Sequence, residues 1–418
     1  MKKNLFLYAI FMVFAALFGC TNRNQINWLE PLSSSGENNN GILISEDSIH
    51  TIKKKETEVP YVIKIPQKKT KACLDTIFNA YDFIPLEITD KCVIGNITKI
   101  IKCKNCFCIL DRENKNVFIF EMDGRFRCRL GDKGHGPKEH VDAWNIAYDE
   151  KKETITLLDL SGRKLQFFNL NGKCIKELSL YLLFTDFEHI GENIILHTEK
   201  SYNKVSDIID LYQIVTVDSL LVPFARGCKT SEKLRQNFSY ASTFKKNNDK
   251  VLYADVLSDT IWEGKEKCMT PFIAMDIEGN KKLTETEKLN MTDYSFRERR
   301  SRETCVFRWF VTPQFISMAY SQEGTPVQGL IYSRNTGKCK IYGFNESPKR
   351  LGDYLAKSTI DGVLSDNTFL KVIQPVDILH AISHKGVKES LTEKELDMVN
   401  KLSIEDNPIL MLVHPVDF

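Results

Sequence analysis

The densest group of side chains that could bind a charged ligand is an arginine cluster near residue 300. It comprises Arg297, Arg299, Arg300 and Arg302, and Trp309 follows a few residues later. Guanidinium groups bind carboxylates and phosphates through paired hydrogen bonds, and a nearby aromatic ring can stack on a sugar or a base. We take these residues as candidates for a ligand-facing loop. Because glutamates are interleaved with the arginines, the alternative interpretation, a solvated helix face, is the one that the pattern favours.

A group of cysteines offers a second kind of chemistry. Cys103, Cys106 and Cys108 lie close together in the sequence, and Cys128 is nearby. A zinc site usually takes two such pairs or adds histidines, so we predict no metal site and expect mainly buried thiols. A disulfide between Cys103 and Cys106 is the alternative. Of the 12 cysteines in the chain, an odd number remains when Cys20 is set aside, so at least one is unpaired.

Motifs typical of catalysis are missing from the chain. It contains no His-Glu-x-x-His and no Gly-x-Ser-x-Gly sequence. The glycine-rich stretch Gly131–Pro137 is a poor phosphate loop, because such a loop must open a helix and an expected strand follows here instead. We interpret it as a connection between two structural repeats. We therefore predict no catalytic residue and no cofactor, while a calcium or zinc ion stays an open alternative.

The elements that must position these residues repeat along the chain. Segment Cys106–Asp111 matches Thr154–Asp159 at an offset of 48 residues, and Val117–Phe120 matches Leu165–Phe168 at the same offset. Each second segment is followed by Asp-Gly or Asn-Gly, a signal for a tight hairpin in which both turn positions take positive φ. Short strands and hairpins with a period of about 40–50 residues are typical of β-propeller blades.

The repeat predicts an all-β fold. We expect a six-bladed β-propeller with four antiparallel strands in each blade, formed by residues 71–418. Later units are weaker than the first two, and a blade length of about 45–50 residues allows six or seven blades. A pair of β-sandwiches is the alternative, but it does not suit a sustained period of this length.

The N-terminus has the form of an export signal. A positively charged start with Lys2 and Lys3 precedes an apolar run over residues 5–18, which is shorter than the roughly 20 residues of a spanning helix. The sequence that ends at Cys20 is similar to a bacterial lipobox, which implies diacylglycerol on the Cys20 sulfur. We predict a signal peptide over residues 1–19 and lipidation of Cys20. An ordinary cleaved signal and an uncleaved anchor are the alternatives.

Residues 20–70 are expected to form a flexible, lipid-anchored tether, because the polar stretch over residues 33–41 has no hydrophobic period. Folding should begin near Thr76. Without Lys2 and Lys3, the 57 basic residues fall to the number of acidic ones, 55. A neutral mature chain argues against a nucleic-acid surface, which normally carries a basic excess.

The chain resembles the six-bladed β-propeller lipoproteins of Bacteroides and related bacteria, a largely uncharacterised family that is distantly similar to NHL-repeat propellers. The resemblance covers most of the chain from about residue 75 to the end. It departs at His140, where an aromatic residue is usual. The segments that carry the resemblance are Ile84–Glu87, Ile94–Ile97, Gly131–His140, Asp259–Trp262 and Asn407–Leu410.

Two features bear on the cellular location. Asp47-Ser48-Ile49 is similar to the O-glycosylation acceptor of exported Bacteroides proteins, so we take Ser48 as a candidate acceptor. Surface lipoproteins of such bacteria tend to carry acidic residues after the lipidated cysteine, and none follows Cys20 directly. This favours the periplasmic side of the outer membrane, with the cell surface as the alternative.

These observations predict a binding module of the cell envelope that is held to the membrane by its lipid. Its ligand would be a glycan, a peptide or an envelope protein, because propeller loops converge on a central channel and function lies in those loops. The alternative is a metal-dependent lyase or lactonase with its site in that channel. A purely structural partner in a larger complex is a third possibility.

Overall fold

The fold is described from a computed structural model of the chain. The chain divides into two units, Met1–Leu43 and Ile44–Phe418. The structure describes residues 46–55, 60–66, 72–198, 209, 211–234, 243–254, 257–322, 325–343, 348, 350–356, 359–364 and 366–418. The expected signal peptide, Cys20 and the tether up to residue 45 therefore lie outside the described residues. Among those that are described, no helix is long and apolar enough to cross a membrane.

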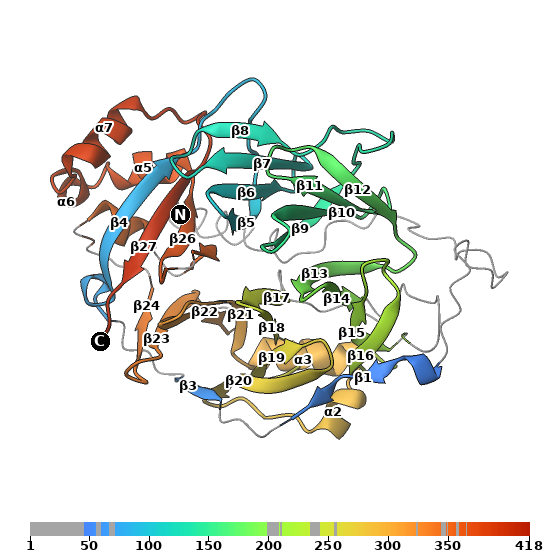
Figure 1. The fold of residues 1–418 in the computed structure, drawn as a ribbon. Helices are drawn as coiled ribbons and strands as arrows, with labels where there is room; N and C mark the ends of the chain where they lie inside the picture. The colour runs from blue at the N-terminus through green and yellow to red at the C-terminus, as the bar shows by residue number, and fades with distance from the viewer. Residues whose placement is uncertain are drawn as a thin grey trace. The chain divides into compact units, whose positions relative to one another are not determined.

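The unit Ile44–Phe418 is a six-bladed β-propeller (Figure 1), as the sequence predicts. Its blades are small sheets arranged in a ring, and the main strands of each blade pair antiparallel. The first two blades are β5 (Ile97–Cys103), β6 (Cys106–Asp111), β7 (Asn116–Glu121) and β8 (Phe126–Arg129), then β9 (Ala143–Asp149), β10 (Thr154–Asp159), β11 (Lys164–Asn169) and β12 (Cys174–Ser179).

The next two blades follow the same order from the centre outward. They are β13 (Phe184–Ile190), β14 (Asn193–Thr198), β15 (Tyr212–Val217) and β16 (Pro223–Lys229), then β17 (Phe244–Asn247), β18 (Lys250–Ala254), β19 (Thr260–Lys265) and β20 (Cys268–Ile277). Blade five is β21 (Cys305–Val311), β22 (Phe315–Ser321), β23 (Gln328–Ser333) and β24 (Cys339–Tyr342).

The sixth blade closes the ring by joining the two ends of the folded unit. It consists of β25 (Gly362–Val363), β26 (Phe369–Ile373), β27 (Ile409–Pro415) and β4 (Phe78–Pro85). The N-terminal β4 pairs antiparallel with the C-terminal β27. Next to this junction the Asn407 amide donates to the carbonyl oxygens of Glu87 at 2.8 Å and Cys92 at 3.0 Å. The Asn407 side-chain carbonyl oxygen accepts the backbone N–H of Ile94 at 2.8 Å, so three of the segments that carry the family resemblance meet where the ring closes.

The 48-residue repeat corresponds to the middle strands of blades one and two. The matched segments are β6 with β10 and β7 with β11. The hairpins that follow differ in one respect from the expected turn: Gly124 (φ +90°) and Gly172 (φ +78°) have positive φ, whereas Asp123 and Asn171 do not. A register shift in β7–β8 and in β11–β12 adjoins each turn. The turns are therefore bulged hairpins with one positive-φ position.

The segment before residue 71 differs from the expected tether. Strand β1 (His50–Thr51) pairs parallel with β16, and β2 (Lys53–Lys54) and β3 (Tyr61–Ile65) pair parallel with β20. The short 3-10 helices η1 (Glu46–Ser48) and η2 (Leu74–Thr76) flank these strands. We call residues 46–55 and 60–66 the N-terminal belt, because their strands pair with the outermost strands of blades three and four. Side chains of β3 alternate between the core and the solvent: Ile63 and Ile65 are buried, whereas Val62 is exposed.

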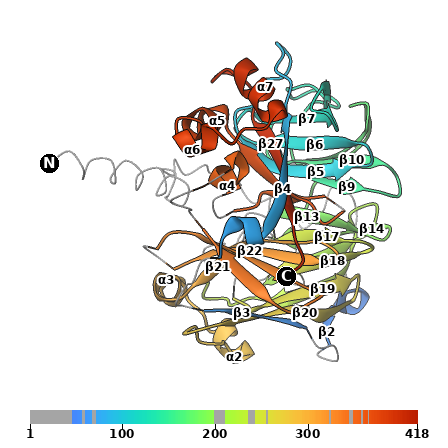
Figure 2. The same cartoon turned by 90° about the vertical axis from the view of Figure 1, so that its left-hand side faces the viewer.

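Helices occupy the connections of the later blades (Figure 2). Helices α2 (Glu285–Leu289) and α3 (Asp293–Arg302) lie between β20 and β21, and α4 (Leu351–Ala356) precedes β25. Helices α5 (Pro375–Ala381), α6 (Lys385–Lys388) and α7 (Glu393–Lys401) lie between β26 and β27. Buried residues of α4, α5 and α6 pack with strands of blades five and six in one hydrophobic core.

Candidate functional site

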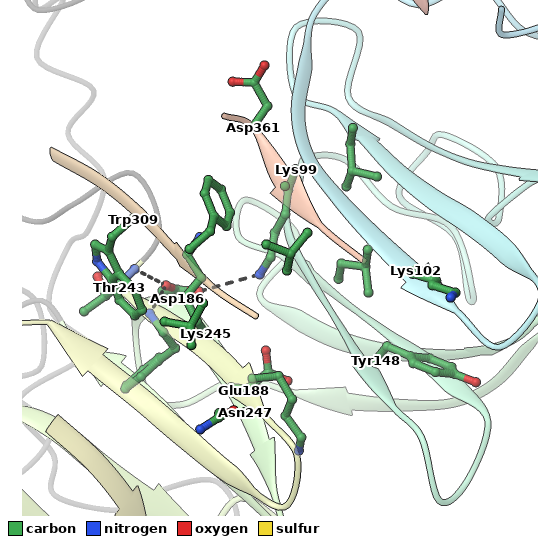
Figure 3. A pocket seen from close by; sticks show the side chains of 18 of the residues that line it. Lys99, Lys102, Tyr148, Asp186, Glu188, Thr243, Lys245, Asn247, Trp309 and Asp361 are labelled. Carbon is green, nitrogen blue, oxygen red and sulfur yellow. Dashed lines mark hydrogen bonds and ion pairs between the residues drawn. The ribbon is translucent and has the colours of Figure 1, made fainter. Parts of the chain in front are cut away.

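A cavity of about 1290 Å³ lies among the innermost strands of the propeller. All six blades line it, through β5, β9, β13, β17, β21 and β25 (Figure 3). Its walls combine aromatic rings with many charged and amide side chains. Small-molecule sites usually enclose about 300–1,000 Å³, so this cavity has room for a ligand together with water.

One polar side chain from each blade forms what we call the polar ring of the cavity. Its members are Lys99, Asn145, Asp186, Lys245, Arg308 and Asp361. Four of the six follow directly after a register shift in their strand, since the pairing skips one residue just before Lys99, Asn145, Asp186 and Arg308. A β-bulge re-aims the side chain that follows it. The repeated bulge therefore places a polar group at the same level of several blades.

Asp186 links four blades through its carboxylate. One oxygen accepts hydrogen bonds from the backbone N–H of Thr243 at 2.6 Å and of Phe244 at 3.0 Å. The other accepts from the Asn145 amide at 2.8 Å and lies 3.9 Å from the Lys99 ammonium. Lys99 also donates to the Asn145 carbonyl oxygen at 3.0 Å. A buried carboxylate with this many donors has its hydrogen-bonding capacity satisfied. Asp186 therefore connects the blades of the polar ring and is not a candidate ligand-binding group.

Arg308 and Asp361 form a second satisfied pair. The Arg308 guanidinium makes an ion pair with the Asp361 carboxylate. The second carboxylate oxygen of Asp361 accepts the backbone N–H of Val372 at 2.9 Å. This pair joins blade five to blade six on the side of the cavity where β25 is only two residues long. Its charges balance each other.

Lys245 is different from the other cations of the polar ring. Its side chain is half-buried and makes no hydrogen bond or ion pair with any residue that the structure describes. Its ammonium lies 4.4 Å from the ring centroid of Phe310 and 5.9 Å from that of Trp309. Burial, reinforced by the positive charge of Lys99, lowers the pKa of Lys245 to about 7.

Glu188 also lines the cavity and lies two residues after Asp186 on β13. Its side chain is buried, and one carboxylate oxygen accepts the backbone N–H of His189 at 3.0 Å. Burial raises the pKa of Glu188, so this group carries less negative charge than an exposed glutamate would. The neighbourhood of Lys245 is therefore richer in positive than in negative charge.

The residues predicted as a ligand-binding group are not brought together. Trp309 lies on β21 and lines the central cavity. Arg297, Arg299, Arg300 and Arg302 lie on α3, and none of them lines that cavity. Arg299 makes an ion pair with Glu303 at 2.8 Å, and Arg302 makes one with Glu298 at 2.9 Å. Arg299 and Arg300 instead line a second cavity of only about 50 Å³. The segment is a helix with paired charges, as the alternative interpretation expects.

The remaining candidates are placed as follows. Cys103 lies opposite Cys106 in the β5–β6 hairpin, and both are buried free thiols, as is Cys108. Among the described residues, no three His, Cys, Asp or Glu side chains form a set of metal ligands, so we assign no calcium or zinc site. Ser48 is exposed at the end of η1. The stretch Gly131–Pro137 connects β8 to β9 and so joins two blades.

Sequence reasoning missed the polar ring, although a local signal for it exists. Four innermost strands carry, at or one residue after their start, an apolar residue, any residue, a polar residue and an apolar residue. These four segments are Ile97–Ile100, Ala143–Ile146, Phe184–Phe187 and Val306–Trp309. The third position of each is the polar residue that follows the bulge. The pattern is short and recurs at uneven spacing, which is why it is hard to see before the blades are known.

Comparison with known proteins places the fold in a family. A family model described as a domain of unknown function, DUF4934, matches residues 38–414. The chain is similar to the structure of a candidate exported protein of Bacteroides fragilis, with 18% identity, a TM-score of 0.70, and coverage of 85% of this chain and 100% of that one. It is also similar to a DUF4221 family member of Bacteroides vulgatus, with 7% identity, a TM-score of 0.50, and coverage of 81% of this chain and 97% of that one. No curated protein matches significantly.

Proposed function

The chain belongs to the DUF4934 family, and from this premise we propose that it is an exported binding protein that holds a small polar ligand in its central cavity. The observation that carries the proposal is the cavity itself, which all six blades line with polar groups and aromatic rings. A concave site with a few convergent polar groups is the usual form of a small-molecule site. The mouth of a propeller channel is also where loops from every blade can contact a ligand.

The N-terminal signal supports a location outside the cytoplasm. We include in the proposal that the chain is lipidated at Cys20 and faces the periplasm from the outer membrane. The described residues begin at Glu46, the first residue of the N-terminal belt, so residues 21–45 would join a lipid at Cys20 to the propeller. The membrane would then be a permanent partner, and the ligand would reach the cavity from the envelope space.

The test is to block the cavity and measure binding of small molecules. Thr98 lines the cavity from β5 and has an exposed side chain, so Thr98→Trp places an indole in the cavity. Thr51→Trp is the matched control, because Thr51 is exposed on the outer rim in β1. A panel of envelope-derived saccharides and short peptides is offered to the full-length chain in equilibrium dialysis. We expect at least one to bind the wild type and the control, and to bind Thr98→Trp at least tenfold more weakly.

Two results would contradict the proposal. One is that every ligand that binds does so equally well to Thr98→Trp and to the control. The other is that binding is lost only in the control, which would move the site to the outer rim.

A further inference from the structure

We propose that the central cavity recognises an anionic group, a carboxylate or a phosphate, through Lys245, Thr243 and Trp309. This inference rests on the proposed function, because it names the chemistry of the ligand that the cavity would hold. Lys245 lies on β17 and Thr243 directly precedes that strand, whereas Trp309 lies on β21 of the neighbouring blade. All three residues line the cavity (Figure 3).

Lys245 differs from the other cations of the polar ring in its charge partners. Arg308 pairs with Asp361, and Lys99 lies within 3.9 Å of Asp186. Lys104, which lines the cavity outside the polar ring, pairs with Glu153 at 2.6 Å. Lys245 has no such partner among the described residues. A half-buried ammonium without a counter-ion is unfavourable. A ligand anion would supply the missing charge.

Two buried hydrogen-bond donors of the cavity wall are unused within the part of the chain that the structure describes. The Thr243 hydroxyl and the Trp309 indole N–H are both buried and have no hydrogen-bond partner among the described residues. Thr243 and Trp309 are each only 2% exposed. Buried donors are nearly always paired in folded proteins. Together with the ammonium they form a set of donors that an anion with several acceptor oxygens can satisfy.

The negative charge that faces Lys245 is weak. The acidic groups next to Lys245 are Asp186 and Glu188. Asp186 is already satisfied by two backbone N–H groups and by Asn145. Burial raises the pKa of Glu188 and favours its neutral form. Because Glu188 is shifted towards its neutral form and the Asp186 carboxylate is already held by its own donors, the positive charge of Lys245, unpaired among the described residues, favours an anion over a cation.

The experiment measures how anions change the thermal unfolding midpoint of the full-length chain. The probes are inorganic phosphate, glucuronate and glucose, each at the same concentration and ionic strength. The variants are Lys245→Met and Lys245→Arg, with Lys104→Met as the matched control because Lys104 also lines the cavity but has a carboxylate partner. A ligand that binds only the folded state raises its stability.

We expect phosphate, glucuronate or both to raise the midpoint of the wild type, of Lys104→Met and of Lys245→Arg by about 2 °C or more at saturating concentration. The midpoint of Lys245→Met should not move. The anion that acts distinguishes a phosphate ligand from a carboxylate ligand. The inference is overturned if Lys245→Met responds like the wild type, or if neither anion has an effect. If glucose alone raises the midpoint, and Thr98→Trp abolishes this rise, the anion inference fails while the proposed function stands.

Discussion

Replacing Lys245 with methionine should make the folded protein more stable. The folded state holds Lys245 without a carboxylate partner among the described residues, and burial lowers its pKa from 10.5 to about 7. One pKa unit corresponds to about 1.4 kcal/mol, so the upper limit of the gain is roughly 5 kcal/mol at or below pH 7. Water in the open cavity and the lost contact with Phe310 reduce it. We expect a net gain of about 1–2 kcal/mol.

The pH dependence of this gain follows from the direction of the shift. The unfolded chain keeps a proton on Lys245 up to about pH 10, whereas the folded chain releases it near pH 7. The penalty is therefore fully present below pH 7 and shrinks as the pH rises towards 10. The difference in free energy of unfolding between Lys245→Met and the wild type should be largest at pH 6 and close to zero at pH 10.

The assay is urea unfolding of both proteins at several pH values, followed by tryptophan fluorescence and circular dichroism. Lys104→Met is the control, because the Lys104 ammonium is largely exposed and pairs with Glu153 at the surface. It should change the stability by less than about 1 kcal/mol. Equal stability of Lys245→Met and wild type at pH 6, or an advantage that grows with pH, would refute the reasoning.

Three further predictions concern the frame around the cavity. Ile63→Ala should lower the free energy of unfolding by about 2–5 kcal/mol, because Ile63 is fully buried in the belt. Val62→Ala, on the exposed face, should change it by less than about 0.5 kcal/mol. Urea unfolding compares the two variants, and equal effects would mean that the belt is not packed against the propeller. Gly124→Ala should be destabilising, because Gly124 has φ +90° and an added Cβ would lie 2.1 Å from the Pro85 carbonyl oxygen. Gly386→Ala is the control, because a Cβ at that position meets nothing within 4 Å. Thermal unfolding should show a lower midpoint for Gly124→Ala but not for Gly386→Ala. Cys20→Ser should abolish incorporation of labelled fatty acid and release the chain from the membrane fraction, and retained label would disprove lipidation at Cys20.

The propeller fold could be predicted because the 48-residue repeat is visible in short, contiguous segments of the sequence. Strands β6 and β7 match β10 and β11 without a gap, and the hairpin glycines Gly124 and Gly172 occupy equivalent turns. Local patterns of this kind survive even where the blades differ in length. The predicted end of the tether at residue 70 differs from the structure, in which belt strands occur before that residue. These strands were hard to predict because β1 and β2 are only two residues long and pair with strands that are distant in the sequence.

The site could not be predicted in the same way, because it is assembled from residues far apart in the chain. Lys99 and Asp361 belong to one polar ring although the full circuit of the propeller separates them. The arginine cluster drew attention because its members are adjacent in sequence, yet a helix places adjacent arginines in different directions and pairs them with glutamates. A lysine such as Lys245 is unremarkable in sequence. Its distinction is the absence of a carboxylate partner among the described residues, which only the fold determines.

The most direct test of the central claim is a crystal structure of the chain with the panel member that binds it most tightly. We expect ligand density inside the central cavity, with the acceptor atoms of the ligand within hydrogen-bond distance of the Lys245 ammonium and the Thr243 hydroxyl. Ligand density on the outer rim or on helices α5–α7, with no ligand density in the cavity, would contradict it.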